Sequence, residues 1–321
     1  MRRRRRSRST RRPRRTSIAS ALACPASLKG VLAASDAAAL LAEGFGRAGI
    51  DCRRVPIADG GEGTLDAFPS GEIAVYPVRD AFGRARNARV RRDGSTAIVE
   101  AAEVIPLDPA RLDPLAASTR GLGDLLLQLD ASRVIVGLGG TANMDGGAGM
   151  LEVIDELPWP TTVLCDVQTR LYDAPRLYGP QKGAAPEDVE LLERRLRARS
   201  DLAAVADLPG SGAAGGLGAA FAALGATLVS GAAALLDLVG FDPHGFDVVV
   251  TGEGTVDATT GEGKAPAEVA RRCVDAGVRC VVFGGIVRAA VPDAETVALS
   301  GDPAQVREDL RELGERLGRT L

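Results

Sequence analysis

Lysine is scarce in this chain and always stands beside glycine. The sequence has 321 residues and 39 lysines and arginines, of which only Lys29, Lys182 and Lys264 are lysine. Their contexts are SLKG, PQKG and EGKAP. A lysine ammonium is a compact point charge, whereas a guanidinium is broad and planar. The lysines that persist in an arginine-rich chain therefore indicate sites for a phosphate or a carboxylate. This holds for Lys29 and Lys264, while for Lys182 a solvated surface position is an equally good interpretation.

Four segments combine glycines with acids or small residues: ADGGEGT (58–64), GLGGTANMDGGAGM (137–150), GSGAAGGLG (210–218) and TGEGTVDATTGEGK (251–264). Glycine lets backbone N–H groups approach an anion closely, and a following helix N-terminus adds its dipole. Carboxylates beside phosphate loops typically hold Mg²⁺ or accept a hydroxyl proton. The combination predicts phosphoryl transfer. For GSGAAGGLG alone, tight turns and helix packing are the better interpretation.

Two nucleotide-binding motifs can be tested against these segments, and both fail. GSGAAG matches G-x-G-x-x-G by letter but follows AVADLP, which is not a clean buried strand, so an NAD-dependent oxidoreductase is the weakest hypothesis. In a Walker A loop ending at Lys264, Ala258 would take the first position and Ala265 would replace the Ser or Thr that binds Mg²⁺. Lys264 therefore does not belong to a P-loop.

Composition excludes several other classes of function. The single histidine, His244, lies in the turn-like segment DPHGFD, and the five cysteines form no C-x-x-C, which argues against a zinc site and a histidine-based hydrolase. Aromatic residues make up 3% of the chain, too few for a base-stacking surface. No apolar run is long enough to span a bilayer. We therefore expect neither a nucleic-acid partner nor a membrane partner.

The elements that carry these segments alternate between strands and helices. RVIVGLGG, FDVVVTGEG and VRCVVFGG are typical of buried strands that end in glycine, and small-residue or amphipathic helical segments separate them. This alternation predicts an α/β fold with a parallel sheet. Loops at the carboxyl ends of parallel strands form the site in such folds, so the glycine-rich segments should converge.

The N-terminus differs from the rest of the chain. It holds ten arginines within its first fifteen residues, and we expect residues 1–17 to be a disordered tail. This segment has three interpretations: a tail that binds nucleic acid or membrane, a secretion signal, or a start codon placed too far upstream. We favour the last, and with it a cytoplasmic location.

Five segments in order, ADGGEGT, GLGGTANMDGGAGM, YGPQKGA, GSGAAGGLGAA and TGEGTVDATTGEGKAP, resemble the bacterial glycerate kinases that lack a P-loop. The resemblance runs from about Cys24 to Gly285. It implies ATP- and Mg²⁺-dependent phosphorylation of glycerate, with the 2-hydroxyl favoured. It also implies two α/β domains with the substrate between them. We expect a Rossmann-like parallel-sheet domain over 18–68 and 245–321, and a second α/β domain, 69–244, inserted in it.

The chain departs from the family pattern at three places. The usual Asp-Ser-Phe-Lys-Gly loop begins here with Ala26, so a carboxylate is missing. The usual Asp-Val-x-Asn-Pro-Leu reads DVQTRLY, which keeps Asp166 but loses Asn-Pro, and the usual Thr-Asn-Asp reads Asn143-Met144-Asp145. The alternative to a glycerate kinase is therefore an inactive or altered-substrate homologue that binds a small acid or a nucleotide.

Under the kinase hypothesis the glycine-rich segments supply the site residues. The expected catalytic residues are Lys29, Asp59, Asp145, Asp166 and Lys264. Mg²⁺ would be held by Asp59, Asp166, Glu253 and Asp257. Phosphates would lie against Gly60, Gly61, Gly139, Gly140, Gly252, Gly254 and Gly263, and the substrate would bind at Ser27, Lys29 and Glu62. We expect the lysine-to-arginine change to be mildest at Lys182, because YGPQKGA has no neighbouring acid, and we expect a monomer or a homodimer.

Overall fold

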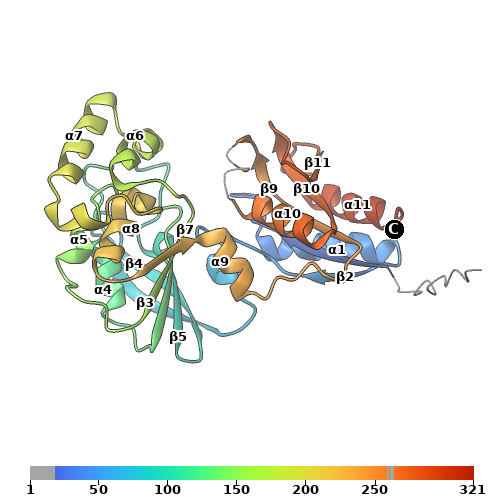
Figure 1. Cartoon of the computed structure of the whole chain (residues 1–321), viewed down its shortest axis with the longest axis horizontal. Helices are drawn as coiled ribbons and strands as arrows, with labels where there is room; N and C mark the ends of the chain where they lie inside the picture. The colour runs from blue at the N-terminus through green and yellow to red at the C-terminus, as the bar shows by residue number, and fades with distance from the viewer. Residues whose placement is uncertain (1–18, 259, 261–263) are drawn as a thin grey trace, which may run out of the picture.

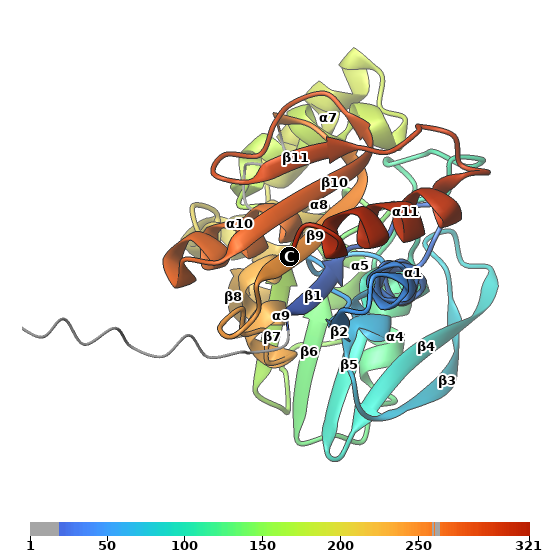
Figure 2. The same ribbon diagram turned by 90° about the vertical axis from the view of Figure 1, so that its right-hand side faces the viewer.

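The structure is a computed structural model that describes residues 19–258, 260 and 264–321. It contains two sheets, each with helices on both faces (Figures 1 and 2). The first sheet is entirely parallel and has the order β11-β10-β9-β1-β2. Its strands are β1 (Ser20–Pro25), β2 (Asp51–Arg54), β9 (Val248–Val256), β10 (Arg279–Val287) and β11 (Glu295–Ala298). The expected parallel α/β class is confirmed, whereas the expected tail over 1–17 lies outside the described residues.

The second sheet has the order β3-β4-β5-β6-β7-β8 and is mixed. β3 and β4 pair antiparallel, as do β4 and β5, and the remaining neighbours pair parallel. Its strands are β3 (Glu72–Arg79), β4 (Ala85–Asp93), β5 (Thr96–Glu100), β6 (Arg133–Gly137), β7 (Thr161–Cys165) and β8 (Thr227–Ser230). The chain thus leaves the first sheet after β2 and returns to it at β9. The domain bounds expected from the sequence stay a prediction.

The central strands β1, β9 and β10 of the first sheet are covered on both faces, which explains their apolar runs, whereas the edge strand β2 is mostly exposed. On one face Val250, Val281 and Phe283 pack against α1 (Ala34–Arg47) and α11 (Val306–Gly318). On the other face lie α9 (Gly231–Leu238) and α10 (Ala265–Ala276). The larger part of the second sheet's core involves α4 (Arg120–Leu126), α5 (Ala148–Leu151) and α8 (Ala213–Ala223).

Helix α9 joins the two sheets. Leu236 packs in the core of the first sheet, and the adjacent Leu235 packs with Ile135 and Leu164 of the second. The same inter-sheet core includes Leu65 of the short helix α2 (Thr64–Ala67). Figure 1 shows α9 between the two sheets. The loops at the carboxyl ends of the strands are therefore held at one junction.

The remaining helices are short or peripheral. They are α3 (Ala101–Val104), α6 (Ala174–Tyr178) and α7 (Pro186–Arg197), with 3₁₀ turns η1 (Leu171–Asp173), η2 (Pro180–Lys182) and η3 (Ser200–Val205). In the described part of the chain, no helix is both long and apolar enough to cross a membrane.

The contact between α1 and α11 depends on two glycines. A Cβ on Gly44 would stand 2.1 Å from the Arg311 carbonyl oxygen, and one on Gly314 would stand 2.4 Å from the Leu41 carbonyl oxygen. Gly46 lies two residues further along α1 and has open space around it. We therefore predict that Gly44→Ala lowers the free energy of unfolding by about 3 kcal/mol, because the helices must separate. Gly46→Ala, the matched control, should raise it by about 0.5–1 kcal/mol. Urea unfolding measures both, and equal effects would contradict this packing.

Candidate active site

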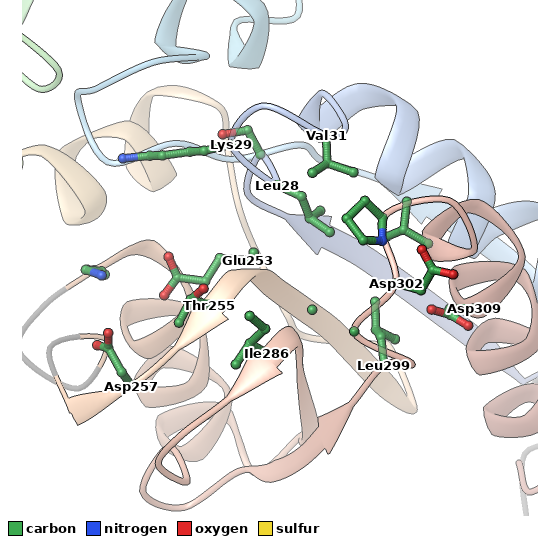
Figure 3. Close-up of a pocket in the computed structure, with 17 residues that line it drawn as sticks. Leu28, Lys29, Val31, Glu253, Thr255, Asp257, Ile286, Leu299, Asp302 and Asp309 are labelled. Atoms are coloured by element: carbon green, nitrogen blue, oxygen red, sulfur yellow. The ribbon is translucent and has the colours of Figure 1, made fainter. Parts of the chain in front are cut away.

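A cavity of about 340 Å³ opens at the carboxyl ends of β1, β9, β10 and β11. Its middle is apolar, with Leu28 and Val31 on one side and Ile286 and Leu299 on the other (Figure 3). Charged residues stand at its two ends. One end carries Lys29 and Glu253, and the cavity lining also includes Asp257 and Lys264. The other end carries Asp302 and Asp309. The cavity is thus an apolar slot with charged residues at both ends.

A second cavity, of about 310 Å³, lies between the first sheet and the inserted part of the chain and shares Ser27 with the first cavity. Of the expected site residues, Ser27, Glu62 and Gly140 line it. The start of α1 also contributes, through Ala33 and Ala34. Five further charged residues of the second cavity were not expected from the sequence: Asp66, Arg86, Arg89, Glu100 and Glu103. Two expected substrate residues, Ser27 and Glu62, thus face one small polar cavity.

The glycine-rich loops of the two parts of the chain touch each other. The Gly139 N–H donates to the Gly60 carbonyl at 3.0 Å. A Cβ on Gly139 would stand 2.5 Å from the Gly61 Cα and 3.0 Å from an oxygen of Asp166. A Cβ on Gly60 would stand 2.7 Å from the Leu164 carbonyl oxygen. The structure thus explains these three glycines by close backbone approach, and their expected contacts with phosphate stay predictions.

The other expected phosphate glycines differ in their surroundings. Gly252 is enclosed, because a Cβ there would stand 2.2 Å from the Phe283 carbonyl oxygen. Gly254 lines the first cavity, and a Cβ there would have its nearest neighbour at 3.6 Å. Gly254 thus has room for a ligand beside it, as does Gly140, which lines the second cavity and whose Cβ would have its nearest neighbour at 3.5 Å. Gly263 lies outside the described residues.

Asp59 lies close enough to Asp166 to affect its ionisation. Burial and then the negative charge of Asp59 raise the pKa of Asp166, to about 6 after the opposing effects of Lys182 and Lys29. The Gly61 N–H donates to a carboxylate oxygen of Asp59 at 3.3 Å. The pair combines one acid from the loop after β2 with one from the end of β7 in the second sheet. It forms the electrostatic link between the two parts of the chain.

Glu253 belongs to the same group of charges. The pKa of Glu253 is raised, chiefly by burial and also by the charge of Asp59. A hydrogen bond from the Thr260 hydroxyl at 2.7 Å and the charges of Lys264 and Lys29 act in the opposite direction. Each of the five residues Lys29, Asp59, Asp166, Glu253 and Lys264 thus acts on at least one other. All five were expected from the sequence, and we call them the charge cluster.

Asp145 is used differently from what the sequence suggested. Its two carboxylate oxygens accept five hydrogen bonds, from the backbone N–H groups of Thr119, Gly147 and Gly149, the Thr119 hydroxyl and the Asn143 amide. Such a carboxylate has little capacity left for a metal ion or a proton. This geometry disfavours the expected catalytic role and points to a carboxylate that holds its own loop together.

The interpretation of Lys182 as a surface residue is wrong. Lys182 is 4% exposed, and its ammonium donates to the Asn143 carbonyl at 2.7 Å. The segment YGPQKGA has no acid of its own, but Asp166 and Asp145 both raise the pKa of Lys182, against the effect of burial. The acids come from distant parts of the chain, so the segment YGPQKGA alone could not show them.

The segment GSGAAGGLG serves packing, as preferred from the sequence. Ala214, Gly215 and Gly216 all have positive φ, between 50° and 90°. A Cβ on Gly215 would stand 2.3 Å from the Asn143 carbonyl oxygen. The Ala214 carbonyl accepts the Asn143 amide at 2.7 Å. This turn fixes Asn143.

Glu100 is a charged residue that the sequence analysis missed. It ends β5, is 3% exposed, and accepts the Leu65 N–H at 2.6 Å. The pKa of Glu100 is raised to about 7, chiefly by burial and to a smaller extent by the charges of Glu103 and Asp66, while the Leu65 N–H and Arg89 oppose the rise. An acid directly after the apolar run TAIV is the signal that could have identified it.

Oxygen ligands are the donor set that Mg²⁺ prefers, and Mg²⁺ usually takes one or two carboxylates together with waters and phosphates. Within the described part of the chain, no three or more His, Cys, Asp or Glu side chains are gathered as a ready metal site. The pair Asp59 and Asp166 nevertheless fits an ion whose remaining ligands come with the nucleotide. Glu253 and Asp257, which line the first cavity, are further candidates.

Comparison with known proteins agrees with this architecture. The model of the glycerate kinase family matches residues 21–155 and 158–313. The chain belongs to the glycerate kinase family. A family member from Escherichia coli, named glycerate 2-kinase, is 34% identical over 303 residues, covering 77% of this chain and 80% of its own. A Bacillus subtilis glycerate kinase is 31% identical over 322 residues, and the match covers 82% of this chain and 84% of that protein.

A solved structure shows the same fold. It is the crystal structure of a protein assigned as glycerate kinase 2 from Salmonella typhimurium LT2. The TM-score is 0.78 at 29% identity, and the match covers 95% of this chain and 98% of that one. The resemblance to the family noted from five sequence segments is confirmed.

The raised pKa of Glu100 predicts a pH-dependent stability. The unfolded chain releases this proton near pH 4.5, whereas the folded protein keeps it up to about pH 7. The contribution of Glu100 is therefore complete below pH 4.5 and is lost as the pH rises through 7. We predict that Glu100→Gln unfolds like the parent at about pH 4.5 and is about 2–3 kcal/mol more stable at about pH 8.

Urea unfolding across this pH range measures the effect. The control is Glu72→Gln, at an exposed position in β3. If Glu100→Gln changed the free energy of unfolding by the same amount at both pH values, the buried Glu100 carboxyl would not be protonated in the folded protein, and the prediction would be wrong.

Proposed function

We propose that this protein phosphorylates glycerate with ATP and Mg²⁺, at the 2-hydroxyl. The observation that carries the proposal is the charge cluster, in which lysines and acids from both parts of the chain meet beside two cavities. Phosphoryl transfer needs cations for the transferred group and carboxylates for a metal ion or a hydroxyl proton. Membership of the glycerate kinase family supports the acceptor, and the name of the Escherichia coli relative supports the 2-position.

The first cavity suits ATP. Its apolar middle, with Leu28, Val31 and Ile286, would take the adenine, and Lys29 and Lys264 stand where the phosphates would emerge. Lys264 immediately precedes α10, so the helix N-terminus adds positive potential there. Asp302 and Asp309, at the opposite end, would lie beyond the adenine, because the ribose connects the adenine to the phosphates.

The second cavity suits glycerate. Ser27, which lines both cavities, would stand between acceptor and donor. Arg89 is paired with Glu103 at 2.8 Å, whereas no carboxylate of the described chain forms an ion pair with Arg86. The Nε of Arg86 donates to the Glu103 carbonyl at 2.6 Å, which fixes its guanidinium at the cavity. Arg86 is thus available to the glycerate carboxylate, and Glu62 to a hydroxyl.

The charge cluster would perform the transfer. Asp59 and Asp166 would hold Mg²⁺, with Glu253 and Asp257 as further ligands; the ion, when bound, neutralises charge on the phosphates. Burial brings the pKa of Asp166 to about 6, so its carboxylate is mostly ionised at neutral pH and can accept the hydroxyl proton if it is not a metal ligand. Lys29 and Lys264 would stabilise charge on the transferred group. Asp145 would position the loop that carries Asn143.

The alternative is a homologue that binds a small acid or a nucleotide without transferring phosphate. Ala26, which replaces the carboxylate usual in the first loop, favours it. The charge cluster favours the kinase, because a binding protein gains little from two half-buried acids held close to each other. A cytoplasmic location and a monomeric or homodimeric state remain part of the proposal.

The direct test is ADP release by the purified full-length chain. We predict that ADP forms from ATP only when both Mg²⁺ and glycerate are present, and that NMR of the product shows the phosphate on the 2-oxygen. NAD should not be reduced by glycerate. ATP binding without turnover toward any small hydroxy acid would favour the alternative.

The compactness of the retained lysines gives a second test. Lys264→Arg and Lys29→Arg keep the charge but broaden it, and a displacement of about 1 Å at the transferred phosphate can cost about a hundredfold in rate. We predict that both variants fold normally and lose turnover by about that factor. The control is Arg271→Lys, an exposed change on α10, which should leave kcat unchanged. Wild-type kcat in Lys264→Arg would place this lysine outside the reaction.

A further inference from the structure

Two large apolar side chains line the first cavity without being covered by the rest of the protein. Val31 and Ile286 are 43% and 47% exposed, and they stand on opposite walls of the slot (Figure 3). The buried Leu28 lies beside the first and the half-buried Leu299 beside the second. Exposed apolar surface on two facing walls is typical of a groove that a ligand covers. The slot therefore fits a flat ring, and a nucleobase is such a ring.

The end of the slot beyond this ring carries hydrogen-bond acceptors. Asp302 and Asp309 both line it. Asp302 is exposed, and each of its carboxylate oxygens already has a partner in its own turn. One oxygen accepts the Ala304 N–H at 2.9 Å, and the other accepts the Gln305 amide at 3.2 Å. Asp302 thus holds the turn that precedes α11.

Asp309 is held by one oxygen and leaves the other open. It is half-buried in the first turn of α11. Its Oδ2 accepts both the backbone N–H of Ser300 at 3.1 Å and the Ser300 hydroxyl at 2.6 Å. Among the residues that the structure describes, none donates a hydrogen bond to Oδ1, and no lysine or arginine forms an ion pair with this carboxylate. Asp309 therefore presents a fixed, unused acceptor at the slot.

The chemistry of this acceptor restricts the base. An ionised carboxylate accepts hydrogen bonds and donates none. If the phosphates lie at the end with Lys29, the edge of the base away from the sugar reaches the end with Asp309. Adenine carries its 6-amino group, a donor, on that edge. Hypoxanthine carries a carbonyl oxygen at the same position, which a carboxylate repels.

We propose that Asp309 selects the nucleobase of the phosphate donor, by accepting a hydrogen bond from the 6-amino group of adenine with its open Oδ1. The inference rests on the proposed function, because it places the donor nucleotide in the first cavity. It does not depend on which small acid receives the phosphate. The residue lies far along the chain from the glycine-rich segments, which explains why those segments gave no sign of it.

Binding of nucleoside diphosphates to the full chain tests this without turnover. Isothermal titration calorimetry with Mg²⁺ and no glycerate should show that wild type binds ADP about thirtyfold more tightly than inosine diphosphate. A hydrogen bond to a charged group that the analogue cannot make corresponds to a factor of this order.

The variant Asp309→Asn should change which base is preferred. Its side chain can keep an oxygen on Ser300 and turn its NH₂ group, a donor, toward the slot. We expect ADP affinity to fall about tenfold and inosine diphosphate affinity to rise severalfold. A merely structural defect would weaken both ligands alike.

The matched control is Glu312→Gln. Glu312 lies one turn further along α11, is exposed, and does not line the slot in the described part of the chain. The change removes the same charge from the same helix. It should leave the ratio of the two affinities within about twofold of wild type.

The outcomes separate this inference from the proposed function. If wild type bound ADP and inosine diphosphate equally, or if Asp309→Asn left their ratio unchanged, the inference would be overturned while the kinase proposal stood. Tighter binding of GDP than of ADP would overturn it as well. If none of the three diphosphates bound, the nucleotide site itself would be wrong, and the proposed function with it.

A second ligand keeps the test independent of how the variant folds. Purine riboside diphosphate has hydrogen in place of the 6-amino group and is smaller than ADP. Wild type should bind it at least about tenfold more weakly than ADP. Equal affinity would overturn the inference even if Asp309→Asn could not be purified.

Discussion

The rest of the site depends on the proximity of Asp59 and Asp166. These acids belong to different parts of the chain, and the negative charge of Asp59 raises the pKa of Asp166. Such a pair is stable only if positive charge is held close by. The charges of Lys182 and Lys29 lower that pKa, and Mg²⁺ would add to them during turnover.

The backbone around the pair must also come close. A Cβ on Gly137 would stand 2.4 Å from the Gly60 carbonyl oxygen, and one on Gly139 would stand 2.5 Å from the Gly61 Cα. Gly231 at the start of α9 would place a Cβ 1.9 Å from the Asp59 carbonyl oxygen. Helix α9 contributes to the core of both sheets and so fixes the same junction. One set of contacts therefore joins the two sheets and brings the acids together. Stability and site geometry are coupled here, and a change that loosens the junction should affect both.

Several features could be predicted from the sequence for physical reasons. Strands such as β6, β9 and β10 are buried on both faces and leave an apolar run that ends in glycine. Of the charge cluster, Glu253 lies in β9 and Lys264 lies between β9 and α10. What could not be predicted depends on contacts between distant segments. The five donors around Asp145 and the burial of Lys182 arise only when the loops at 119, 143, 166 and 182 meet. Glu100 was missed because an acid after a strand looks like an exposed residue until α2 covers it.

The most direct test of this account is the position of the metal ion. Crystals grown with Mn²⁺ and a non-hydrolysable ATP analogue would locate the ion by its anomalous scattering. The account predicts an ion in contact with the carboxylates of Asp59 or Asp166, with the nucleotide phosphates reaching it from the side of Lys29 and Lys264. An ion held elsewhere, for example at Asp302 and Asp309, with Asp59 and Asp166 contacting neither metal nor phosphate, would contradict it.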